Sequence, residues 1–170
     1  LLQIGTREID IAIEIEFFFK RQGADKGFDP IVVSGDRSAL PHGKPSEKAL
    51  AKGDFVTMDF GAKVDGYTAD ITRTVVISEA SDRHREIYAA VEKAQQAGIK
   101  NVVAGASAKT PDEEVRKVFS DAGMVDHFTH GLGHGIGLVV HDAGRLSVKS
   151  EDIIETGQVW TVEPGVYYEG

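Results

Sequence analysis

Apolar and polar residues alternate along residues 54–77, on both sides of a short polar break. Alternation with a period of two is typical of a strand that has one face in the core. The Asp65-Gly66 pair at the break favours a two-residue type I′ turn, because both central residues of that turn have positive φ. The pattern therefore predicts an antiparallel hairpin. The predicted core face of its first strand carries Val56, Met58, Phe60, Ala62 and Val64.

The turn also predicts the register of this hairpin. Counting back from it places Asp59 opposite Thr72 and Asp70 opposite Gly61. Asp59 and Asp70 are then diagonal neighbours on the polar face, about 7–8 Å apart at the backbone. Two carboxylates this close repel each other unless a cation lies between them, so the pair is a candidate site for one or two divalent metal ions. A solvated acidic face without metal fits the hairpin equally well.

Residues 6–23 carry two conflicting signals. Alternation with a period of two along residues 9–17 indicates a strand. An N-capping Thr6, acidic residues in the first turns and basic residues before Gly23 indicate a helix instead.

Two later segments have the spacing of surface helices with one buried stripe. In residues 81–99 the apolar positions recur every three or four residues. The second helix is predicted to begin at Thr110, which can act as its N-cap, and to end at Gly123. With a short strand around residues 28–35 and the hairpin, these helices predict a single α+β domain, residues 1–170, in which helices cover an antiparallel sheet.

Three histidines lie in the glycine-rich stretch of residues 128–144. Alternating glycines disfavour a helix there and let backbone, ligand and neighbouring strand come close. In an extended chain His130 and His134 share a face, whereas His141 has the opposite parity unless a bend intervenes. Three imidazoles in so short a span indicate a ligand-binding site, although a plain glycine-rich loop has a similar composition.

Two further residues are candidates only in the context of the others. His42 lies in a polar loop of residues 34–46, where a histidine is as often simply solvated. Glu163 stands at the end of a predicted strand that Pro164 halts. On its own, Glu163 would be interpreted as a charged surface residue. Beside the hairpin aspartates and a histidine, it supplies the fourth oxygen or nitrogen ligand that a metal centre needs.

The composition of the chain restricts the partners and the metal ligands that the protein can have. The formal net charge of −8 disfavours nucleic acid or an anionic membrane as the main partner, because both attract basic surfaces. With no cysteine, any metal must be held by oxygen and imidazole ligands. The lack of cysteine also fits a reducing cytoplasm. We find no signal peptide and no apolar run long enough to span a bilayer.

Five motifs resemble, in order, those of the pita-bread metallopeptidases, the family of Xaa-Pro dipeptidase (prolidase), aminopeptidase P and methionine aminopeptidase. The Xaa-Pro branch is the most similar. The motifs are Ala39-Leu40-Pro41-His42-Gly43, Met58-Asp59-Phe60-Gly61-Ala62, the segment 66–74, the segment 130–138 and Val162-Glu163-Pro164-Gly165-Val166-Tyr167. They extend over nearly the whole chain, so the signal is specific. The resemblance implies the pita-bread fold and favours a helix for residues 6–23.

The resemblance also implies a dinuclear metal centre. By it, Asp59 and Asp70 bind the centre, Asp70 bridges both ions, and His134 and Glu163 hold one of them. The carboxylate-rich ligand set favours manganese, with cobalt and zinc also compatible. Two ions about 3.5–4 Å apart lower the pKa of a bridging water, so that hydroxide attacks the carbonyl before proline. Glu163 is expected to accept or relay a proton.

Three histidines are implied to contact the substrate, a proline-containing peptide. His42 corresponds to a histidine near the substrate's amide, His141 to one that steadies the tetrahedral intermediate, and His130 to one that lines the pocket for proline. The resemblance fits a dipeptidase or an aminopeptidase, and a homodimer is compatible with either.

The motifs of the family continue beyond this chain. A second bridging glutamate is expected after Gly170, and a helix and a separate domain are expected before Leu1, so we expect an incomplete catalytic domain with weak or no activity alone. The segment 142–145 also departs from the family pattern, where glutamate and proline are common. Two alternatives are a creatinase-like hydrolase that works without metal and a non-catalytic pita-bread module that binds other proteins. All four expected ligands within the chain are present, which argues against both.

Overall fold

The computed structural model describes residues 2–168, which form two compact units. Unit 1 contains the residues up to Arg85 together with Leu138–Val140 and Tyr167–Tyr168, and unit 2 contains Glu86–Gly137 and His141–Val166. Each unit is described by itself. No helix within residues 2–168 combines the length and the apolar character needed to cross a membrane.

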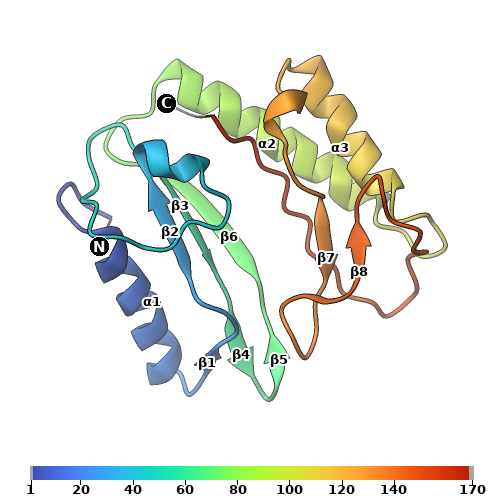
Figure 1. Cartoon of the computed structure of the whole chain (residues 1–170), viewed down its shortest axis with the longest axis horizontal. Helices are drawn as coiled ribbons and strands as arrows, with labels where there is room; N and C mark the ends of the chain where they lie inside the picture. The colour runs from blue at the N-terminus through green and yellow to red at the C-terminus, as the bar shows by residue number, and fades with distance from the viewer. Residues whose placement is uncertain (1, 169–170) are drawn as a thin grey trace. The chain divides into compact units, whose positions relative to one another are not determined.

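Unit 1 is built from antiparallel strands with one helix packed against them (Figure 1). Its elements are α1 (Glu8–Arg21), β1 (Asp25–Lys26), β2 (Ile31–Ser34), the 3-10 helix η1 (Gly35–Ala39), β3 (Phe55–Phe60), β4 (Ala62–Val64), β5 (Tyr67–Thr68) and β6 (Ile71–Val76). The strands pair in the orders β2-β3-β6 and β1-β4-β5. Ile11 and Ala12 of α1 join Val32 and Val56 in the core of this unit.

The segment Glu8–Arg21 is helical. The family motifs favoured this helix, whereas the alternation of apolar residues indicated a strand. The period-two pattern is only apparent, because Ile13 and Phe17 are more than half exposed while Ile11 and Ala12 are buried. The N-cap prediction was wrong. The residue before the helix is Arg7, and it makes no side-chain capping hydrogen bond.

The hairpin has the predicted turn and register. Asp65 and Gly66 have φ values of 51° and 87°, as a type I′ turn requires. On either side of the turn Val64 pairs with Tyr67, and farther along Asp59 pairs with Thr72. The predicted core face is shorter than expected, since Val64 is 54% exposed. A side chain next to a tight turn has too few neighbours to be buried.

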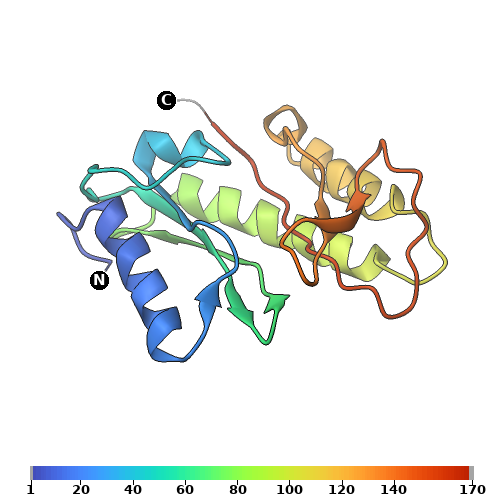
Figure 2. The same ribbon diagram turned by 60° about the horizontal axis from the view of Figure 1, so that its bottom comes forward.

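Unit 2 packs two helices against a short pair of strands (Figure 2). It contains most of α2 (Asp82–Asn101), with α3 (Thr110–Asp121), the 3-10 helix η2 (Val125–His127), β7 (Gly133–Gly135) and β8 (Asp142–Leu146). Its core holds Ala94, Val115, Phe119, Leu132 and Leu146. The cap predicted for the second helix was wrong, because Thr110 is already helical and Lys109 precedes it without a side-chain bond.

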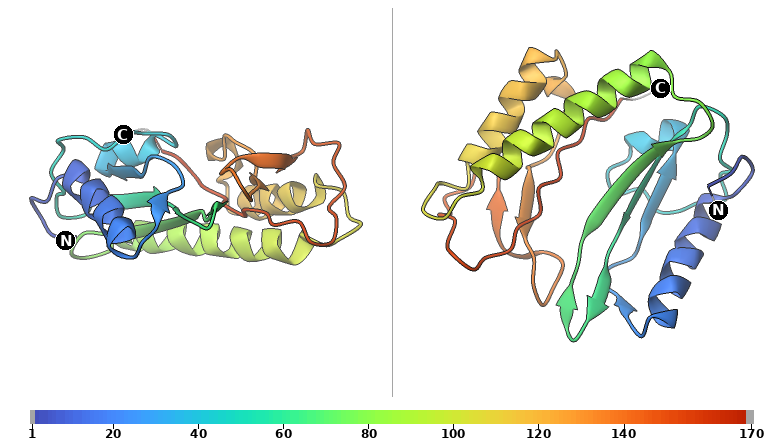
Figure 3. Two further views of the ribbon diagram at one scale, coloured as in Figure 1. Left: turned by 90° about the horizontal axis from the view of Figure 1, so that it is seen from below. Right: turned by 180° about the vertical axis from the view of Figure 1, so that it is seen from behind.

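The last predicted strand is an extended segment with a single bridge, between Gly135 and Trp160, and is not a regular strand. Figure 3 shows this segment between α2 and the β7–β8 pair. Its backbone nevertheless follows β7, since Thr161 N–H donates to the His134 carbonyl oxygen and Glu163 N–H to that of Leu132, both at 2.9 Å. The segment therefore brings Glu163 beside the histidine stretch.

Candidate metal centre

The acidic face of the hairpin in unit 1 follows from strand alternation. Asp59 of β3 pairs with Thr72 of β6. On the same face Thr57 pairs with Thr74, and their hydroxyl oxygens lie 3.2 Å apart. Asp70 comes directly before β6 with the parity of Thr72 and Thr74, and both aspartates are half-buried. The two carboxylates thus belong to one polar face within unit 1.

Gly61 allows the two arms of the hairpin to approach between these aspartates. A Cβ at this position would lie 1.7 Å from the carbonyl oxygen of Ala69, closer than any side chain permits. The strand is interrupted here and resumes at Ala62, whose carbonyl oxygen accepts a hydrogen bond from Ala69 N–H at 2.8 Å. Only glycine fits this approach.

His134 is the most buried of the predicted site residues, with 6% of its surface exposed. It lies in β7 between two glycines that leave no room for side chains. A Cβ at Gly133 would be 2.1 Å from the Thr161 carbonyl oxygen, and one at Gly135 would be 2.0 Å from that of Ala143. The alternating glycines of this stretch therefore serve close packing around an imidazole, as expected for an extended chain.

The hydrogen bonds of His134 determine its tautomer. Its Nδ1 lies 2.9 Å from the carbonyl oxygen of Gly135, which can only accept, so Nδ1 carries the proton. In the neutral ring Nε2 is then an acceptor, and it lies 3.3 Å from Oε1 of Glu163. Two acceptors at this distance are stabilised by a shared cation, such as a divalent metal ion or a proton. The pair therefore offers one nitrogen and one oxygen ligand of the kinds that a divalent metal ion accepts.

His141 lies beside this pair. Although its parity differs from that of His134, residues 137–140 form a bend, and the two imidazole rings meet edge to face with centroids 4.3 Å apart. The structure thus brings His134, His141 and Glu163 together within unit 2. The bend that the parity argument required is present.

The backbone of His130 is held by a half-buried ion pair that the sequence analysis missed. Arg116 of α3 donates to the His130 carbonyl oxygen at 2.8 Å and to the carboxylate of Asp112 at 3.3 Å. Its guanidinium also lies over the ring of Phe128, 4.6 Å from the centroid. Asp112 has no exposed surface. Its spacing of four residues from Arg116 was the only signal in the sequence.

His42 is exposed, in the loop that follows η1 in unit 1. The ends of this loop are fixed by Glu8, which the sequence analysis placed in a helix without a role. Its carboxylate accepts hydrogen bonds from the backbone and side chain of both Ser34 and Ser46, on either side of His42. Arg37 also donates to it, at 3.1 Å.

The predicted ligands are divided between the units, with Asp59 and Asp70 in unit 1 and His134 and Glu163 in unit 2. Within residues 2–168, no group of three or more histidine, aspartate or glutamate side chains is placed to hold a metal ion. The assignment of these residues to one centre therefore stays a prediction.

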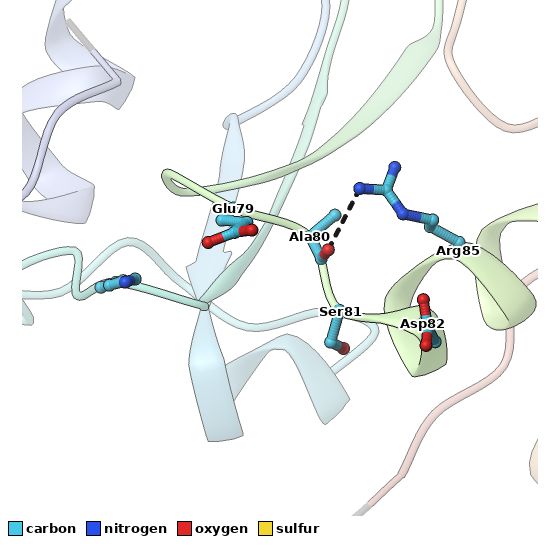
Figure 4. A pocket seen from close by; sticks show the side chains of 6 residues that line it. Glu79, Ala80, Ser81, Asp82 and Arg85 are labelled. Carbon is cyan, nitrogen blue, oxygen red and sulfur yellow. Dashed lines mark hydrogen bonds between the residues drawn. The ribbon is translucent and has the colours of Figure 1, made fainter.

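Unit 1 also has a hollow of about 480 Å³ at the start of α2 (Figure 4). It is lined by Lys52, Glu79, Ala80, Ser81, Asp82 and Arg85, and the Arg85 guanidinium donates to the carbonyl oxygen of Ala80 at 3.2 Å. None of the predicted site residues lines it. We assign it no role.

Comparison with known proteins gives consistent matches over the whole chain. The model of metallopeptidase family M24 matches residues 1–170. An uncharacterized peptidase of Bacillus subtilis is 48% identical over 164 residues, which are 96% of this chain and 46% of that protein. An Xaa-Pro dipeptidase of Pyrococcus furiosus is 42% identical over 164 residues, 96% of this chain and 47% of that protein. The chain thus spans about half the length of these relatives.

Solved structures agree with the sequence matches. An Xaa-Pro dipeptidase from Bacillus anthracis superposes with a TM-score of 0.96 at 46% identity, covering 99% of this chain and 48% of that one. An Escherichia coli aminopeptidase P in complex with substrate gives 0.88 at 30% identity, covering 97% and 42%. These similarities confirm the predicted α+β, pita-bread fold.

Proposed function

Because the chain belongs to metallopeptidase family M24, as its motifs predicted, we propose that the intact gene product hydrolyses the peptide bond before proline with two divalent metal ions. The observation that carries the proposal is the facing pair in unit 2, where Nε2 of His134 lies 3.3 Å from a carboxylate oxygen of Glu163. The acidic face of the hairpin supplies two further carboxylates of the kind such ions prefer.

The substrate class is supported by the relatives. Several of them are named as Xaa-Pro dipeptidases or prolidases, and one as an X-Pro aminopeptidase of Thermotoga maritima. We propose a proline-containing peptide as the substrate of this protein too. The cytoplasmic location and the homodimer expected earlier stay predictions.

We propose that Asp59, Asp70, His134 and Glu163 would hold the metal, that Asp70 would be the bridging ligand, and that manganese would be the favoured ion. When bound, two such ions supply Lewis acidity and lower the pKa of a water molecule enough for hydrolysis near neutral pH. The protein's part would be to orient the lone pairs of these side chains toward the ions. The Nδ1–H bond of His134 to Gly135 does this for one of them.

The other residues act on the substrate. His42 or His141 donates a hydrogen bond to the oxygen that gains charge as the carbonyl is attacked. Glu163 accepts a proton from the attacking water and passes it to the departing nitrogen of proline. His130 lines the pocket for the proline ring, and Arg116 fixes the backbone of His130 through its carbonyl oxygen at 2.8 Å.

Two aspartates of the hairpin provide a matched test. In the full-length protein, Asp70→Asn should lower kcat/KM for an Xaa-Pro dipeptide by more than about 100-fold, because loss of a bridging ligand exceeds the 10–100-fold cost of a supporting residue. Asp65→Asn is the control, since Asp65 is exposed at the turn and asparagine tolerates its positive φ. Equal rates for the two variants would remove the bridging role.

The alternatives give different outcomes in the same assay. A metal-free full-length protein that hydrolyses a guanidino substrate would favour the creatinase-like hydrolase. A metal-free protein without hydrolytic activity would favour the binding module. The peptidase requires chelator-sensitive cleavage of an Xaa-Pro dipeptide.

His42→Ala tests the assignment of a substrate-contacting histidine. We expect kcat to fall about 10²–10⁴-fold, as for loss of a proton-transferring or hydrogen-bonding group, while metal content stays as in the wild type. His127→Ala, in η2, is the control and should leave kcat unchanged. Loss of metal in His42→Ala would instead make His42 a ligand.

A further inference from the structure

Thr161 lies two residues before Glu163 in the extended segment that follows β7. Its hydroxyl oxygen accepts a hydrogen bond from the backbone N–H of His134 at 3.0 Å and donates one to Oε1 of Glu163 at 2.9 Å. One side chain thus connects two of the proposed metal ligands.

The direction of this connection follows from the single proton of a hydroxyl group. Two acceptors lie near that proton, Oε1 of Glu163 at 2.9 Å and the carbonyl oxygen of His134 at 3.5 Å. The shorter bond to a carboxylate is the stronger one. Thr161 is therefore an acceptor toward the backbone of one ligand and a donor toward the side chain of the other.

The backbone around Thr161 is fixed independently of its side chain. Thr161 N–H donates to the His134 carbonyl oxygen at 2.9 Å, and Glu163 N–H donates to that of Leu132 at the same distance. Gly133 packs closely against the Thr161 carbonyl group. Loss of the hydroxyl group would therefore leave the segment in place, release the Glu163 carboxylate and remove one acceptor of the His134 N–H.

Glu163 needs such a restraint because 33% of its side chain is exposed. A mobile carboxylate loses conformational freedom when it binds an ion, and a carboxylate already held in place does not. We infer that Thr161 is a positioning residue that orients the Glu163 carboxylate for a divalent metal ion, an inference that rests on the proposed function.

The test compares variants of the full-length protein, stripped of metal and titrated with manganese(II) alone by calorimetry. Thr161→Val removes the hydroxyl group and keeps the branched shape, whereas Thr161→Ser keeps the hydroxyl group. We expect the Kd for manganese(II) to rise about 10–100-fold in Thr161→Val and to stay near the wild-type value in Thr161→Ser. Thr110→Val, at the start of α3, is the control and should bind as the wild type.

An unchanged Kd in Thr161→Val would overturn the positioning role and leave the proposed peptidase standing. A wild-type protein that binds no manganese(II) would overturn both. If Thr161→Val does not fold, Thr161→Ala and Thr161→Ser decide the question, because both lose the methyl group and only alanine loses the hydroxyl. Weaker binding by Thr161→Ala supports the inference, and equal binding by the two overturns it.

Discussion

Glu8 has no exposed surface, yet its carboxylate is fully hydrogen-bonded. Oε1 accepts from the backbone and side chain of Ser34, and Oε2 accepts from the backbone and side chain of Ser46 and from Arg37. Burial alone would raise the pKa of Glu8, but the hydrogen bonds from Ser46, Ser34 and Arg37 together lower it below the ordinary value. The hydrogen bonds of unit 1 therefore stabilise the charged form of Glu8.

This lowered pKa predicts a dependence of stability on pH. A group whose pKa is lower in the folded protein stabilises it above the ordinary glutamate pKa, and the contribution is lost as the pH falls through the folded pKa. Glu8→Gln should remove that acid-side loss and lower the free energy of unfolding at neutral pH. We expect about 3 kcal/mol, at the low end for a buried ion pair, since the Arg37 side chain is 33% exposed.

The measurement is denaturant unfolding of the full-length protein and Glu8→Gln across the acidic range. Glu47→Gln is the control, because the Glu47 side chain is 78% exposed and its ion pair with Arg7 is screened by solvent. Parallel stability curves for the wild type and Glu8→Gln would show that Glu8 is not the titrating group.

The elements of the hairpin were predictable because their signals are local. The turn pair and the alternation on either side suffice to place Asp59 opposite Thr72. The interruption at Gly61 could not be predicted, because it depends on how closely the two arms approach. For the same reason the sequence could not say that the segment before Glu163 follows β7 without becoming a regular strand.

Gly61→Ala tests the close approach within the hairpin. A Cβ 1.7 Å from the Ala69 carbonyl oxygen forces the backbone to move, so we expect a loss of about 3 kcal/mol, the upper range for overpacking. Gly53→Ala is the control. Its φ of 86° is strained for alanine, but nothing lies within 4 Å, so we expect about 1 kcal/mol. Denaturant unfolding measures both, and equal losses would contradict a steric role for Gly61.

At the scale of the whole molecule, family and fold could be predicted, since five ordered motifs identify both. The fold of relatives at TM-scores of 0.88–0.96 confirms that prediction. The convergence of the four predicted ligands could not be predicted in the same way. Asp59 and Asp70 belong to unit 1 and His134 and Glu163 to unit 2, and the chain spans about half the length of its relatives. Local sequence patterns identify such residues as candidates, but they contain no information on the distances between residues of different units.

The central claim is that these four side chains bind a pair of divalent ions in the intact protein. Elemental analysis of the purified full-length protein tests it directly. We predict close to two transition-metal ions per chain in the wild type, fewer than one in Asp70→Asn, and loss of Xaa-Pro hydrolysis when a chelator removes them. A protein that contains no metal and still cleaves an Xaa-Pro dipeptide at the same rate would contradict the account.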